Sequence, residues 1–97
     1  RYPEAIMAFD EAKRIRVATY GTEHISVADT LNNLGTIYRE QARYPEAIMA
    51  FDEAKRIRVA TYGPEDLLVA DTLNNVGNVY KAQARYREAI TAIEEAK

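Results

Sequence analysis

The sequence of 97 residues has no cysteine and no tryptophan, and it has no long apolar run. Without cysteine, disulfide bonds and thiolate metal ligands are excluded, so packing alone must hold the fold, as is usual in reducing compartments. We therefore expect a cytoplasmic protein. No segment approaches the roughly 18–20 apolar residues that a membrane-spanning helix needs, and no signal segment opens the chain. Membranes are therefore not expected as partners.

An excess of one charge is also lacking, because 13 basic and 15 acidic side chains leave a formal net charge of −2. This balance provides no bulk attraction to phosphate groups, so we expect no nucleic-acid partner. Two basic KRIR tracts, at 13–16 and 55–58, could be read as nucleic-acid patches. Each lies toward the end of a predicted helix, where positive charge complements the helix dipole, and we favour that interpretation.

What the sequence does contain is a repeat. The segment RYPEAIMAFDEAKRIRVATYG occurs unchanged at 1–21 and at 43–63, which sets a period of 42 residues. The segments that follow the two copies, 22–42 and 64–84, differ at 9 of 21 positions, and a third copy begins at Arg85. Periods of this size are typical of solenoids, in which units stack around a shared core.

The repeat divides the chain into three parts of a single array. We interpret 1–21 as the second helix of a truncated repeat, 22–63 as a full repeat and 64–97 as a repeat truncated at its C-terminal end. Because the chain begins without methionine and inside a repeat, we expect a piece of a longer array.

Each unit reads as two helices. Apolar residues follow helical spacing along the first helix, at Val27, Leu31, Leu34 and Tyr38, and again one period later. Gly21 and Gly63 suit helix ends, and the corner at 41–43 leaves room only for a short turn, which predicts antiparallel hairpins. The sequence therefore predicts an all-α chain of five helices.

A single histidine, His24, is the main candidate for chemistry outside this pattern. Asp66 takes its place one period later, which favours a role at the start of a helix over catalysis. No second ligand accompanies His24, no carboxylate is paired in a way that singles out an acid and a base, and no phosphate loop or nucleophile motif is present. We expect no enzymatic activity, no cofactor and no bound metal.

The pattern of small and large residues resembles the tetratricopeptide repeat. Its first copy consists of Leu31, Leu34, Gly35, Tyr38, Tyr44, Ala47, Phe51 and Ala54, and its second of Leu73, Val76, Gly77, Tyr80, Tyr86, Ala89, Ile93 and Ala96. The phrase TLNNLG and the 42-residue period look most like the long repeats of kinesin light chains. This resemblance implies an α-solenoid of helix hairpins in a right-handed superhelix.

The family's usual unit has about 34 residues, so each unit here has roughly two extra helical turns. The extra turns bring in Ile15, Val17, Ile57 and Val59, and we expect their burial to offset the small number of repeats.

The resemblance also implies that the first helices line a concave surface that binds peptides. The predicted peptide-binding residues are Asp29, Asn32, Asn33, Thr36, Arg39, Asp71, Asn74, Asn75, Asn78 and Lys81. Asparagine side chains carry a donor and an acceptor and can pair with an extended backbone, while Arg39 and Lys81 favour an acidic ligand residue. An alternative is that the asparagines are solvated or bond neighbouring helices.

Two functions follow from this interpretation. The first is a protein–protein interaction scaffold that binds a peptide segment on the concave face. The alternative is a structural repeat spacer that self-associates head to tail, without a peptide ligand, through the uncovered ends of the array.

Overall fold

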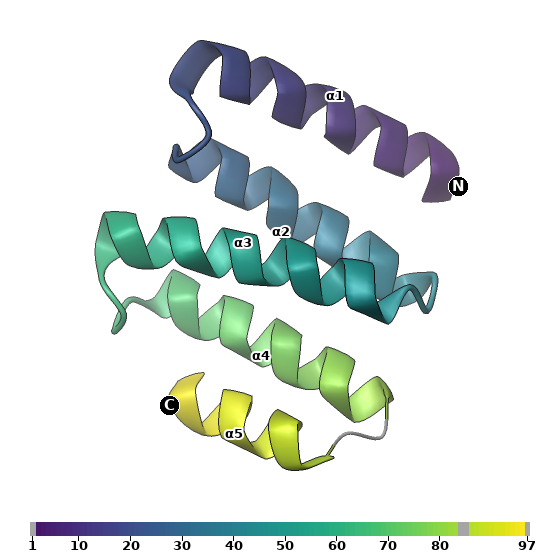
Figure 1. Ribbon diagram of the computed structural model, residues 1–97, viewed down its shortest axis with the longest axis vertical. Coiled ribbons are helices and arrows are strands. Elements are labelled where there is room, and N and C mark those ends of the chain that lie inside the picture. Colours follow the sequence, from purple (N-terminus) through teal and green to yellow (C-terminus); the bar gives the residue numbers. More distant parts are fainter. Residues whose placement is uncertain (1, 84–85, 97) are drawn as a thin grey trace.

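A computed structural model of the protein describes residues 2–83 and 86–96, without the side chains of 86–89 (Figure 1). Over these residues it contains five α-helices and no strand: α1 (Tyr2–Tyr20), α2 (Ile25–Glu40), α3 (Tyr44–Tyr62), α4 (Leu67–Ala82) and α5 (Tyr86–Ala96). Consecutive helices run antiparallel, and the series extends from α1 at one end to α5 at the other. The predicted all-α solenoid of five helices is confirmed. The predicted packing roles of Tyr86 and Ala89 lie outside the described side chains.

The helices pack in the order in which they occur in the chain. Helix α2 lies against α1 and α3, α4 lies against α3 and α5, and α2 also touches α4. In the terms of the repeat, α2 and α4 are first helices, whereas α1, α3 and α5 are second helices. Each first helix is therefore held between two second helices, and among the described residues α1 contacts only α2.

Two apolar clusters form the core between these helices. One contains Val27, Ala28, Leu31, Ala50, Ala54 and Ile57, and the other contains Ala47, Phe51, Val76, Val79 and Ala92. The small residues allow helices to approach closely. A Cβ atom added at Gly35 would lie only 2.7 Å from Cε1 of Phe51, so α2 and α3 can pack at this distance only with glycine there.

The helix ends follow the predicted signals. Gly21 and Gly63 both have a φ of +92°, a conformation that favours glycine. The turn between α2 and α3 is closed by the Arg43 amide, which donates to the Tyr38 carbonyl at 2.8 Å, and Ala42 adopts a φ of 61° there. His24 Nδ1 accepts a hydrogen bond from the Ser26 amide at 3.1 Å, which confirms its role at the start of α2. Asp66 Oδ1 does the same for Leu68 at 2.9 Å.

Two sequence-based predictions are wrong in part. Ile57 is fully buried as expected, but Ile15 is 50% exposed because α1 contacts only α2 among the residues that the structure describes. The KRIR tracts do not reach the helix ends, since neither α1 nor α3 has a basic residue in its last turn. Arg58 points instead into the structure, where it is 5% exposed, so the dipole interpretation does not explain this residue.

Candidate functional site

The predicted binding residues of α4 lie along its open side. Asp71, Asn74, Asn78 and Lys81 are all exposed, whereas Val69, Leu73 and Val76 on the other side of the helix are buried. The equivalent residues of α2 are more covered, because Asn32, Thr36 and Arg39 are half-buried and only Asp29 is exposed. Of the two remaining asparagines, Asn33 is exposed and Asn75 is half-buried.

One asparagine pair joins the two first helices. Asn75 Nδ2 on α4 donates to Asn32 Oδ1 on α2 at 3.1 Å. The alternative that asparagines bond neighbouring helices is therefore confirmed for this pair. Asn32, the first residue of the pair Asn32–Asn33, points toward the following repeat, and Asn75, the second residue of the pair Asn74–Asn75, points toward the preceding one. The other residue of each pair, Asn33 or Asn74, is exposed.

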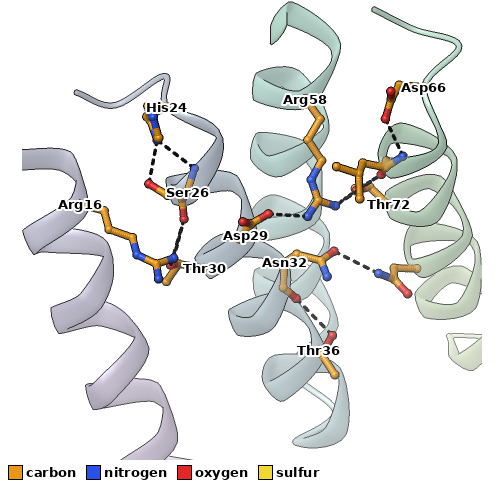
Figure 2. Close-up of polar contacts among 12 residues, drawn as sticks. Arg16, His24, Ser26, Asp29, Thr30, Asn32, Thr36, Arg58, Asp66 and Thr72 are labelled. Atoms are coloured by element: carbon orange, nitrogen blue, oxygen red, sulfur yellow. Dashed lines mark hydrogen bonds and ion pairs between the residues drawn. The ribbon is translucent and has the colours of Figure 1, made fainter. Parts of the chain in front are cut away.

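Asp29 makes a contact that the sequence did not suggest. Arg58 on α3 donates from Nη2 to Asp29 Oδ1 at 3.0 Å and from Nη1 to Thr72 Oγ1 on α4 at 2.7 Å (Figure 2). Arg58 thus ties together α2, α3 and α4. Arg16 and Thr30, one period earlier, form the same arginine–threonine hydrogen bond at 2.8 Å, but they give no signal for the contact with Asp29.

Thr36 also has an internal partner. Its hydroxyl donates to the carbonyl oxygen of Asn32, one helical turn earlier, at 3.1 Å. A hydroxyl engaged in this way is less available to a ligand. The structure therefore brings Asp29, Asn32, Thr36 and Asn75 into contacts of its own, while Asn33, Asp71, Asn74, Asn78 and Lys81 face outward.

A second ion pair connects the two halves of the full repeat at the surface. Arg56 on α3 donates from Nη2 to Glu23 Oε2 at 3.0 Å, and it also contacts Glu53 on its own helix. The hydrogen bond from Arg56 lowers the pKa of the Glu23 carboxyl, and the two carboxylates raise the pKa of the Arg56 guanidinium. The Glu53 carboxyl also has a lowered pKa because of Arg56.

Two shallow grooves lie on the other side of the first helices. One runs between α1 and α3 and is lined in part by Leu34, Tyr38 and Met49. The other lies one period later, between α3 and α5, where Val76, Tyr80 and Thr91 take the same places. Neither groove is lined by a predicted binding residue. The grooves are therefore separate from the polar row.

Residues 2–83 and 86–96 contain neither a metal-binding cluster nor a candidate membrane span. No group of three or more histidine, aspartate or glutamate side chains in this range is arranged to hold a metal ion. None of the helices described there combines the length and the apolar character that crossing a bilayer requires.

Comparison with known proteins identifies the class of this fold. The family model for the tetratricopeptide repeat matches residues 1–58 and 26–97, so the chain belongs to the tetratricopeptide repeat family. Repeats of this family form a non-enzymatic scaffold fold that generally mediates protein–protein interactions.

Among solved structures, the chain is similar to the crystal structure of BtubC (BKLC) from P. vanneervenii, with a TM-score of 0.93 and 25% sequence identity. The alignment covers 99% of this chain and 38% of that protein. The match supports the kinesin light chain-like character of the 42-residue repeats. No curated protein sequence matches the chain.

Proposed function

We propose that the chain is a protein–protein interaction scaffold whose first helices, α2 and α4, bind a peptide segment. The observation that carries this proposal is the exposed row Asp71, Asn74, Asn78 and Lys81 on a helix whose other side is buried. The general role of tetratricopeptide repeats in protein interactions supports it.

The chemistry of the exposed row indicates what kind of peptide would fit. Asn74 and Asn78 offer amide donors and acceptors that can pair with the backbone of an extended segment of any sequence. Lys81 adds a positive charge at one end of the row, and Asp71 adds a negative charge at the other. A terminal carboxylate would be repelled by Asp71, so we propose an internal segment with an acidic residue near Lys81.

A peptide library tests this proposal on the 97-residue chain. Binding is expected to be saturable. Lys81→Ala is expected to weaken the binding of acidic peptides by about tenfold at low salt, because one charge-assisted hydrogen bond is lost. Asn78→Ala is expected to weaken acidic and neutral peptides alike, because it removes backbone contacts.

Lys55→Ala is the matched control, because Lys55 lines the groove between α3 and α5 and lies away from the polar row. If Lys55→Ala weakens binding and Lys81→Ala does not, the ligand lies in that groove and the proposed face is wrong. A library in which no peptide saturates contradicts peptide binding altogether.

A structural spacer that self-associates is the second candidate function. The observation that favours it is that, among the described residues, α1 contacts only α2, so that Ile15 is half exposed although its repeat equivalent Ile57 is fully buried.

A further inference from the structure

The two grooves described above have no role in the proposed peptide binding. Among the described residues α1 and α3 do not touch each other, so α2 forms the floor of the space between them. In the same way α4 forms the floor between α3 and α5. The grooves have volumes of about 370 and about 460 Å³, within the range of pockets that hold small ligands. Their recurrence indicates that the groove is a property of the repeat unit.

The chemistry of the groove also recurs. In both units the floor carries an aliphatic residue and a tyrosine, which are Leu34 and Tyr38 in the groove between α1 and α3. The charged residues of the walls are the same in the two grooves: Asp10 and Asp52, Lys13 and Lys55, and Glu53 and Glu95. Each groove therefore combines an apolar floor with walls on which carboxylates outnumber lysines.

The apolar floor alone offers little to a ligand. Leu31 and Leu34 are only 6% and 3% exposed, so an apolar partner would remove little further surface from water. Met49 on the α3 wall is 71% exposed, and its flexible thioether can pack along the aliphatic part of an incoming side chain. Affinity for an occupant must therefore come mainly from the charges of the walls.

Among these charges, the aspartates are the ones left to pair. Arg56 holds Glu53 and lowers its pKa, and the charge of Lys13 contributes to this shift. By contrast, Asp10 and Asp52 have no ion pair with any residue that the structure describes. Burial raises the pKa of the Asp52 carboxyl, and the charge of Lys55 offsets only part of this rise. A further cation would stabilise the ionised form of both aspartates.

The groove between α1 and α3 already holds one cationic side chain of the protein itself. The Arg43 guanidinium lies over the Tyr38 ring, 4.7 Å from its centroid, and Arg43 Nη2 is 3.2 Å from Glu46 Oε2. Both Tyr38 and Glu46 line this groove. An apolar surface beside a carboxylate is thus an arrangement that accepts a guanidinium here, because the planar group both stacks and forms ion pairs.

We propose that these grooves form a second binding surface, which takes an arginine-bearing basic segment of a partner protein. One arginine side chain lies in each groove, with its aliphatic stem against the floor and its guanidinium beside Asp10 or Asp52. A segment with two suitably spaced arginines fills both grooves, and the second contact adds to the affinity of the first. This surface is separate from the polar row of the proposed function and prefers the opposite charge.

Fluorescence anisotropy with labelled peptides tests the proposal on the 97-residue chain. The probes carry two arginines joined by glycine–serine spacers of graded length, and matched peptides carry citrulline or glutamate in place of arginine. We expect saturable binding of the arginine peptide only, weakening as salt is added. Equal binding of the citrulline peptide, preferred binding of the glutamate peptide, or no saturable binding of any arginine peptide would each overturn the proposal.

Substitutions in the walls should act with opposite signs. Asp10→Asn and Asp52→Asn should each weaken binding of the arginine peptide about threefold, as expected for one partly exposed ion pair, and together about tenfold. Lys13→Ala and Lys55→Ala remove like charges and should tighten it. The matched control, Glu65→Gln, removes a carboxylate from an exposed position outside both grooves and should change nothing. A loss from Glu65→Gln equal to that from Asp10→Asn would indicate unspecific attraction and contradict the proposed site.

The carboxyl group of Asp52 gives a direct readout, because a guanidinium beside it favours the ionised form. Carbon NMR titration should show a lower pKa of Asp52 with saturating arginine peptide and no change with the citrulline peptide. An unchanged pKa under saturation would place the arginine elsewhere. The two binding surfaces fail separately: binding of arginine peptides without acidic peptides would sink only the proposed function, and the reverse result would sink only the groove site.

Discussion

Helices α1 and α3 have the same 19 residues but differ in what those residues do. Ile57 is fully buried and Arg58 is 5% exposed in α3, whereas Ile15 is 50% exposed in α1. The local sequence is constant, so the difference comes from the neighbouring helices: α3 packs against both α2 and α4, whereas α1 contacts only α2 among the described residues. In a solenoid, stability is approximately the sum of contributions from the units and from the interfaces between them. Helix α3 has an interface with the helix that precedes it, α2, and α1 has no equivalent interface among the described residues.

The comparison also shows which contacts α1 and α3 make with the helix that follows each of them in the chain. Arg16 and Arg58 both bond the threonine 14 residues later, with Nη1 to Oγ1 distances of 2.8 and 2.7 Å. Only Arg58 reaches a carboxylate, because Asp29 lies on the preceding first helix. The contacts to the following helix are thus repeated in full, and the contact to Asp29 depends on the preceding helix, α2.

The largest expected effect separates the two isoleucines. Ile57→Ala removes a fully buried side chain and leaves a cavity between α2 and α3, so we expect a loss of about 2–5 kcal/mol in the free energy of unfolding. Ile15→Ala removes a half-exposed side chain, and we expect a loss of at most about 1 kcal/mol. Urea denaturation at low protein concentration, where copies remain separate, measures both.

These two variants change the same residue type in the same local sequence, so each is the control of the other. Equal losses would mean that the two helices are equally covered in solution, either by association or by a different packing of α1. Dilution distinguishes the two, because only association depends on concentration.

The next effect separates the two arginines. Arg58→Ala removes the hydrogen bonds to Asp29 and Thr72 from a buried position, and we expect a loss of about 2–3 kcal/mol in the free energy of unfolding. Arg16→Ala removes only the forward contacts from a half-buried position and should cost about 1 kcal/mol. Chemical denaturation of both variants gives the difference.

Asp29→Asn removes the charge of the ion pair but leaves the buried Arg58 side chain in place, so it measures the ion pair separately. The Asp29 side chain is 57% exposed, so we expect this change to cost less than about 1 kcal/mol, well below the cost of Arg58→Ala. A loss from Asp29→Asn as large as that from Arg58→Ala would mean that the carboxylate, and not the packing of Arg58, dominates this contact.

Much of this fold could be predicted because the determining patterns are local. The apolar spacing at Val27, Leu31 and Leu34 defines the buried side of α2, and all three are buried. His24 and Asp66 start their helices through bonds to residues two positions away, which a sequence shows directly. The repeat then placed equivalent residues on equivalent helices.

What the sequence could not show depends on contacts between distant residues. Asp29 and Arg58 are 29 positions apart, and nothing local distinguishes an arginine that turns inward from a solvated one. Asn32 was predicted to face a ligand, but the neighbouring repeat supplies Asn75 as its partner. Ile15 is exposed because α1 contacts only α2 within the described part of the chain, and no property of Ile15 itself reveals this.

The smallest expected effect is the pH dependence of the surface pair at Glu23. Its folded-state pKa lies below the usual value because Arg56 donates hydrogen bonds to the carboxylate. The pair therefore contributes stability above the unfolded-state pKa of about 4.3, and this contribution is lost as pH falls through the lower folded-state value. Glu23→Gln should lower the thermal midpoint slightly at pH 7 and leave it unchanged near pH 2, as followed by circular dichroism.

Glu65→Gln sharpens this measurement, because Glu65 is the same residue one period later and no ion pair to it occurs among the residues that the structure describes. In the separated chain its substitution should not change the midpoint at either pH. A fall at pH 7 as large as that of Glu23→Gln would mean that the loss of any surface carboxylate, and not of the contact with Arg56, lowers the midpoint.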